Sequence, residues 1–128
     1  MGATTWQWIL DAATQGAEEP WGPLPTWVLT HRDFTAPAGA EMTFTDAPVT
    51  EVHAAALERA GGRDVWLVGG GELVGQFHDA GLLDEVWLQF APVTLGSGVP
   101  VLPRHVELRL EDVVRNRDFA CVRHTVVR

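Results

Sequence analysis

The chain has 128 residues, of which 46% are hydrophobic, and this size and composition suit one domain with its own core. Its formal net charge of −8 opposes nucleic-acid binding, because affinity for a duplex comes largely from Lys and Arg on phosphates. No apolar run approaches the roughly 20 residues that span a bilayer, and the first residues lack the pattern of a secretory signal. Cys121 is the single cysteine, so we expect a cytoplasmic protein without disulfides and without membrane or nucleic-acid partners.

Caps, periodicity and turn residues predict an alternation of helices and strands. Thr4 or Thr5 is suited to cap a helix that carries Trp6 and Trp8 and ends before the proline-rich loop at 16–25. The elements predicted after that loop are, in chain order, a strand at 27–29, a polar turn at 30–33, an extended segment at 42–44, a helix at 51–60, a strand at 64–68, a helix at 72–80, a strand at 85–90, an ordered loop at 92–103, and strands at 106–111 and 119–127. This order predicts an α/β domain with a mixed, largely parallel sheet, helices on both faces, and antiparallel strands at the carboxy end.

The apolar run at 64–68 is typical of a strand covered on both faces, and we expect it to lie beside the strand at 85–90. Trp66 and Trp87, on these two strands, are predicted to be the least exposed of the six tryptophans. Gly81 is placed where a helix end favours a left-handed residue.

The glycine turn, Val68-Gly69-Gly70-Gly71, joins a predicted strand to a predicted helix. Such a turn lets backbone N–H groups at a helix start approach a phosphate without obstruction by side chains. Glycines at this place also serve for a tight bend that binds nothing. The dinucleotide pattern Gly-x-Gly-x-x-Gly is only partly met, because Gly69, Gly71 and Gly75 have one residue too many in the second gap. A standard Rossmann fold is therefore disfavoured, and both roles of the turn stay open on this motif alone.

Three runs in fixed order carry a resemblance to a known family: residues 64–73, 80–86 and 91–98. They hold the glycine turn, a Leu-Asp-Glu segment that leads into a strand, and a Pro-Val-x-Leu-Gly-x-Gly loop. Together they resemble the reductase domain of bacterial bifunctional riboflavin-biosynthesis deaminase-reductases, which is dihydrofolate-reductase-like. The resemblance implies a three-layer α/β sandwich and hydride transfer from NADPH to a small heterocycle or a ribosylated pyrimidine.

Two further segments resemble the family upstream. Residues 2–6 are similar to its Gly-x-x-Thr-Tyr element, where a helix start faces the cofactor phosphates, with Thr5 as the matching threonine and Trp6 in place of tyrosine. Residues 30–32 resemble the polar segment beside the adenosine ribose and its 2′-phosphate, so Arg32 is a candidate for selecting NADPH by a charge-assisted contact. A lone arginine is otherwise a solvated surface cation.

The resemblance implies a set of cofactor-binding residues: Gly2, Thr4, Thr5, Thr30, His31, Arg32, Val68, Gly69, Gly70, Gly71, Glu72 and Leu73. Trp21, in the proline-rich loop, is the candidate for stacking on the substrate. No catalytic residue is identified. The five histidines show no pair at zinc-ligand spacing, so no metal site is predicted. Asp84 and Glu85, neighbours next to a strand, point to opposite faces and are interpreted as structural.

The family normally carries a strand, a substrate-facing loop, a helix and a second strand before the Gly-x-x-Thr element, whereas this element opens the present sequence. We therefore expect one N-terminally short domain over residues 1–128 and hypothesise that the true start lies upstream. Two functions stay open: an NADPH-dependent reductase, or a non-catalytic domain with weak or no nucleotide binding. A homodimer is expected under either, because pairing covers the apolar edges of an incomplete sheet.

Overall fold

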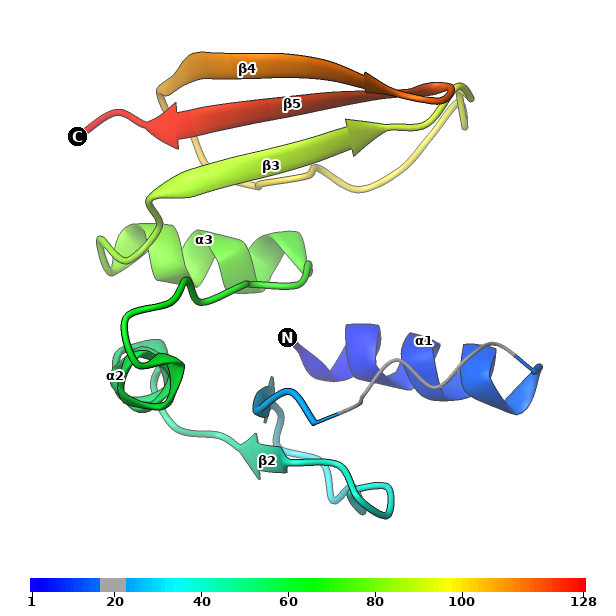
Figure 1. Cartoon of the computed structure of the whole chain (residues 1–128), viewed down its shortest axis with the longest axis vertical. Coiled ribbons are helices and arrows are strands. Elements are labelled where there is room, and N and C mark those ends of the chain that lie inside the picture. Colours follow the sequence, from blue (N-terminus) through cyan, green and yellow to red (C-terminus); the bar gives the residue numbers. More distant parts are fainter. Residues whose placement is uncertain (17–22) are drawn as a thin grey trace.

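The computed structural model describes residues 1–16 and 23–128, and Figure 1 shows how the elements of this part are arranged. The elements are, in chain order, α1 (Ala3–Thr14), β1 (Thr26–Leu29), β2 (Met42–Thr45), α2 (Val49–Ala60), α3 (Gly71–Asp79), β3 (Glu85–Phe90), β4 (Leu108–Asn116) and β5 (Phe119–Val126). None of the helices in the described ranges is long and apolar enough to cross a membrane.

Two sheets are formed, one parallel and one antiparallel. β1 and β2 pair in parallel, with Val28 opposite Phe44. β5 lies between β3 and β4 and pairs antiparallel with both. The α/β class and the presence of both kinds of pairing are confirmed, but the strands of the described ranges lie in two separate sheets and not in one. Figure 1 shows α3 beneath the antiparallel sheet, and α1 and α2 beside the parallel pair.

The helix ends follow their local sequence. Gly61 ends α2 with a φ of 59°, in the left-handed region where glycine has no Cβ penalty. Gly81 follows α3 with a φ of 71°, as predicted. The start of α1 differs from the prediction, because Gly2 is the N-cap residue and no side chain caps the helix. Thr4 and Thr5 lie inside the first turn instead of before it.

The strand predicted at 64–68 is wrong. Residues 64–70 are irregular backbone and pair with neither sheet. Trp66 and Trp87, predicted as core residues, have 82% and 68% of their surface exposed. An apolar run becomes a buried strand only where a neighbouring strand pairs with its backbone and other elements cover its faces. In the described ranges, the free edge of β3 does not pair with this segment.

The core lies in two places. Trp6 and Val28 are 1% and 0% exposed, and the ring of Trp6 packs on Phe44, with 6.1 Å between centroids. The second part of the core lies between α2 and α3, where the rings of His53 and Phe77 pack edge to face with 6.2 Å between their centroids. The other buried apolar residues of the described ranges are Val52, Ala56, Leu73, Leu83 and Val126.

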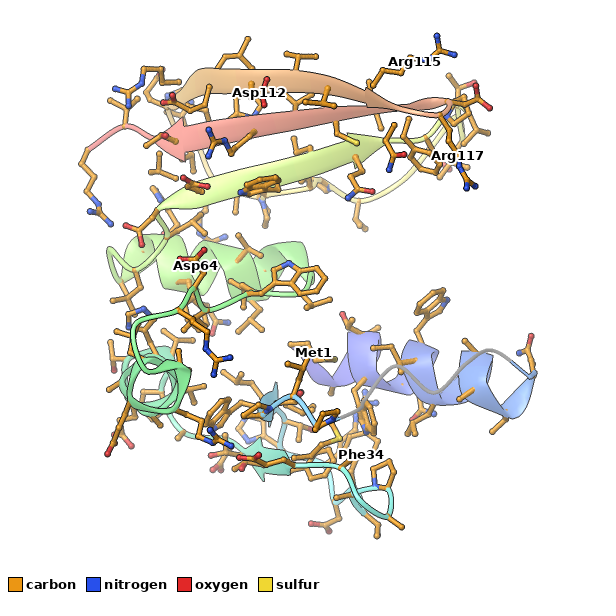
Figure 2. All side chains as sticks on the ribbon, in the orientation of Figure 1. Met1, Phe34, Asp64, Asp112, Arg115 and Arg117 are labelled. Carbon is orange, nitrogen blue, oxygen red and sulfur yellow. The ribbon has the colours of Figure 1, made fainter. Side chains whose placement is uncertain are left out.

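The hairpin of β4 and β5 forms two strands of the antiparallel sheet. Its turn is closed by Arg117, which has a φ of 55°. Figure 2 places Arg115 and Arg117 at this turn, far from Met1, which lies beside the start of α1. The β4–β5 turn is therefore remote from the start of α1.

Candidate functional site

The glycine turn leads into α3 without a side-chain cap. Gly69 and Gly70 have φ values of 55° and 79°, a conformation that residues with a Cβ rarely adopt. Gly70 is the N-cap residue of α3, and its carbonyl accepts the first intrahelical bond, from the Val74 N–H at 3.0 Å. The N–H groups of residues 71–73 are thus left without an intrahelical acceptor, and the start of α3 carries the partial positive charge that attracts anions.

The start of α1 lies directly beside this turn. Gly2 caps α1, again with no side-chain cap, and its carbonyl accepts from the Trp6 N–H at 3.1 Å. The Thr5 hydroxyl oxygen is 4.0 Å from the position that a Cβ on Gly70 would take. A Cβ on Gly2 would lie 4.0 Å from Leu73 Cδ2. Two uncapped helix starts therefore converge, as Figure 1 also shows.

Strand β1 fixes the start of α1. The Leu29 N–H donates to the Met1 carbonyl at 2.9 Å, and Gly2 forms an isolated parallel bridge with Leu29. Thr30, which follows Leu29, donates its N–H to the Thr45 carbonyl at 2.8 Å. The three segments predicted to bind the cofactor, at 2–5, 30–32 and 68–73, are therefore tied together by strand pairing and helix contacts.

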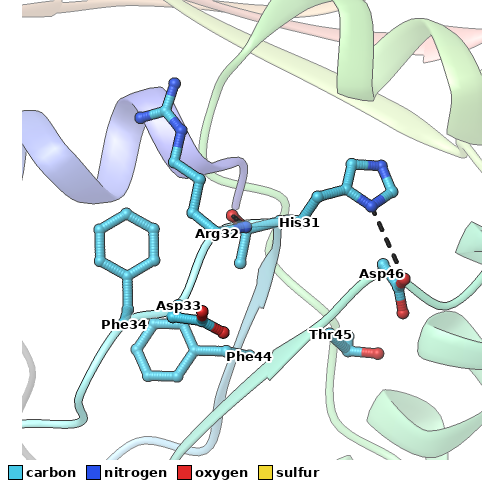
Figure 3. A pocket seen from close by; sticks show the side chains of 8 residues that line it. His31, Arg32, Asp33, Phe34, Phe44, Thr45 and Asp46 are labelled. Carbon is cyan, nitrogen blue, oxygen red and sulfur yellow. Dashed lines mark hydrogen bonds and ion pairs between the residues drawn. The ribbon is translucent and has the colours of Figure 1, made fainter.

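A shallow pocket of about 380 Å³ lies at the ends of β1 and β2 (Figure 3). Three of its lining residues were predicted cofactor-binding residues, and the whole lining is Thr30, His31, Arg32, Asp33, Phe34, Phe44, Thr45 and Asp46. The Phe34 and Phe44 rings stack at 5.6 Å, and His31 Nδ1 lies 3.6 Å from Asp46 Oδ2. The side chains of His31 and Arg32 diverge, and within residues 1–16 and 23–128 no carboxylate pairs with Arg32.

The five pocket residues at 33, 34 and 44–46 were missed by sequence reasoning. The signal that finds them is the parallel pairing of β1 with β2, because the carboxyl ends of parallel strands meet at one edge of a sheet, where ligands bind in open α/β folds. β2 was predicted only as an extended segment, without a partner.

Gly71 is packed tightly against the ordered loop that the sequence predicted at 92–103. A Cβ on Gly71 would lie 2.6 Å from the Val101 carbonyl oxygen and 2.9 Å from that of Pro100. The glycine turn thus has a packing role at Gly71 as well as an open helix start.

The remaining predicted residues take different places. Leu73 is 9% exposed and belongs to the core, Val68 is half-buried, and Thr4 is exposed. The Glu72 carboxylate points along α3 to Arg104, whose guanidinium donates to both of its oxygens, at 2.9 and 3.2 Å. This hydrogen bonding holds the pKa of the Glu72 carboxyl below its usual value. Trp21 lies outside the described residues.

The chain has an α/β fold that matches solved structures of the dihydrofolate-reductase-like type. The sequence matches the family described as the RibD C-terminal domain over residues 22–121. The chain belongs to this family, which is associated with NADPH-dependent reduction in riboflavin biosynthesis.

Solved structures are similar to the chain in fold. A protein from Shewanella sp. PV-4, assigned provisionally to riboflavin biosynthesis, superimposes with a TM-score of 0.75 at 21% identity over 100% of this chain and 72% of its own. Acinetobacter baumannii RibD gives a TM-score of 0.53 at 19% identity over 70% of this chain and 27% of its own. These two structural matches show that the chain shares the fold of these proteins.

Two uncharacterised Bacillus subtilis proteins are similar in sequence. YwjB is 33% identical over 82 residues, which are 57% of this chain and 47% of YwjB. YyaP is 44% identical over 45 residues, which are 35% of this chain and 24% of YyaP. The chain thus matches less than half the length of either relative.

Proposed function

We propose that the chain binds NADPH and serves a reductase that transfers hydride to a small heterocycle or a ribosylated pyrimidine. The observation that carries the proposal is the meeting of two uncapped helix starts, at Gly2 and at Gly70. Family membership supports the same cofactor and reaction type. We propose that the reaction takes place in the cytoplasm, where a free thiol such as that of Cys121 is common.

The residues present fit a dinucleotide. Backbone N–H groups of residues 71–73 and 3–5 would hold the diphosphate, and Gly69, where a Cβ would meet nothing within 4 Å, leaves space for its approach. The pocket at the ends of β1 and β2 offers His31 and Arg32 to the ribose and its 2′-phosphate. NADPH, when bound, supplies the hydride, and the chain orients it.

The first test is a titration with NADPH, followed by its fluorescence. We expect saturation at a concentration between about 1 μM and 1 mM, the range common for enzyme ligands. Absence of saturation up to the upper limit overturns the proposed function. Oxidation of NADPH in the presence of a ribosylated pyrimidine, followed by absorbance, tests the hydride transfer itself.

Arg32→Gln tests the choice between NADPH and NADH. Because Arg32 is an exposed cation with no ion-pair partner among the described residues, its removal is expected to weaken NADPH about tenfold, as for the loss of one charge-assisted contact, and to leave NADH unchanged. Arg117→Gln, at the remote β4–β5 turn, is the matched control and should change neither affinity. Equal loss of both cofactors in Arg32→Gln would contradict a contact with the 2′-phosphate.

A second candidate function is a non-catalytic dimeric domain with weak or no nucleotide binding. Exposed apolar side chains favour it, above all Val99 at 91%, Trp66 at 82% and Leu95 at 81%, since large exposed apolar residues mark surfaces that associate. We propose a homodimer for either function. Sedimentation of the purified chain tests the dimer, and NADPH binding without turnover on any ribosylated pyrimidine supports the non-catalytic function.

A further inference from the structure

Arg104 lies along α3 from its first turn to its last. The guanidinium donates from both terminal nitrogens to the Glu72 carboxylate, at 2.9 and 3.2 Å, and from Nε to Asp79 Oδ2 at 2.9 Å. It also donates to the Pro103 carbonyl at 2.9 Å. With 27% of its side chain exposed, Arg104 is the least exposed of the arginines that form ion pairs in the described ranges.

Gly75 makes this arrangement possible. A Cβ at Gly75 would lie 3.0 Å from Arg104 Cζ and 3.2 Å from Nη1, so the guanidinium rests on bare helix backbone. Arg104 is brought there by the loop whose Pro100 and Val101 carbonyls abut Gly71. The loop therefore contacts α3 in two ways: its carbonyls pack on Gly71, and Arg104 forms ion pairs along the helix.

The ion pair with Arg104 also fixes the position of the Glu72 carboxylate. Glu72 is the second residue of α3, beside the N–H groups that are proposed to hold the diphosphate. A carboxylate free to turn toward those groups would compete for the helix start and repel a phosphate. The guanidinium over Gly75 holds the carboxylate one turn further along the helix and neutralises it.

We propose that Arg104 is a positioning residue for dinucleotide binding, which keeps the start of α3 open to a diphosphate by holding and neutralising the Glu72 carboxylate. This inference rests on the proposed function. It adds a residue outside the glycine turn, 32 positions from Glu72 in the chain, to those that set the affinity for NADPH.

The test compares NADPH affinities of variants that fold, as judged by circular dichroism. Arg104→Gln is expected to bind NADPH about fivefold more weakly than the wild type, the effect of one uncompensated surface charge. Adding Glu72→Gln to it is expected to restore the affinity to within about twofold, because the repelling carboxylate is then gone. A purely structural role of Arg104 predicts no such recovery, since Glu72→Gln restores no contact with the loop.

Two single variants keep the proposal testable should Arg104→Gln not fold. Glu72→Gln alone removes the acidic charge in the first turn of α3 and leaves the Arg104 cation over Gly75, so it is expected to bind NADPH about twofold to threefold more tightly. Asp79→Asn removes the other ion pair, at the far end of α3, and is the matched control with an expected change below about twofold. Weaker binding by Glu72→Gln, or no recovery in the double variant, overturns the proposal, whereas no binding by the wild type overturns the proposed function as well.

Discussion

Trp6→Ala is expected to lower the free energy of unfolding by about 3–5 kcal/mol, the usual cost of removing a buried aromatic ring. Trp6 is 1% exposed, lies on α1, and packs on Phe44 of β2. Its removal leaves a cavity between the helix and the parallel sheet that rigid neighbours fill only in part. A loss of this size is a large fraction of the stability of an ordinary domain.

Trp8→Ala is the matched control on the same helix. Trp8 is 69% exposed, so its truncation is expected to change the free energy of unfolding by less than about 0.5 kcal/mol. Urea denaturation followed by circular dichroism measures both variants under the same conditions. Similar losses for the two tryptophans would show that α1 does not pack on the sheet as described.

Trp6 also links stability to the proposed site. α1 presents its uncapped start, with Gly2 and Thr5, beside Gly70. If Trp6 is removed, the helix loses one of the contacts that set its position, and NADPH affinity is expected to fall together with stability. Trp6, in the segment that resembles the Gly-x-x-Thr-Tyr element of the family, is thus a residue of the core.

Local signals in the sequence predicted local structure well. Gly81 was placed at a helix end because the left-handed conformation there favours glycine, and its φ is positive. The strand at β3 was predicted from its period of two, and Val86 and Leu88 are the more buried side of that strand. Such features depend only on residues within a few positions of one another.

Features that depend on distant neighbours were predicted less well. The run at 64–68 has the composition of a covered strand, but composition does not supply a hydrogen-bonding partner, and Trp66 is exposed. The contact of Gly71 with the loop at 100–103 joins segments about 30 positions apart, and no pattern within either segment indicates it. The ion pairs of Arg104 escaped prediction for the same reason.

Gly71→Ala is expected to be the most damaging small change at the candidate site. Its new Cβ would lie 2.6 Å from the Val101 carbonyl oxygen and 2.9 Å from the Pro100 carbonyl oxygen. Both atoms belong to the backbone, so no side-chain rotation relieves the clash, and the loop or the helix start must move. Overpacking of this kind costs about 1–3 kcal/mol. Because the moved backbone carries the N–H groups of the proposed diphosphate site, NADPH affinity is expected to fall at least about tenfold.

Gly98→Ala, in the same loop, separates the clash from the general effect of replacing a glycine. Nothing lies within 4 Å of a Cβ on Gly98, and its φ is not in the left-handed region. This variant is therefore expected to keep its stability within about 0.5 kcal/mol and its NADPH affinity within about twofold. Thermal unfolding and fluorescence titration of the two variants give the comparison. If Gly71→Ala is tolerated as well as Gly98→Ala, the loop does not rest on the glycine turn.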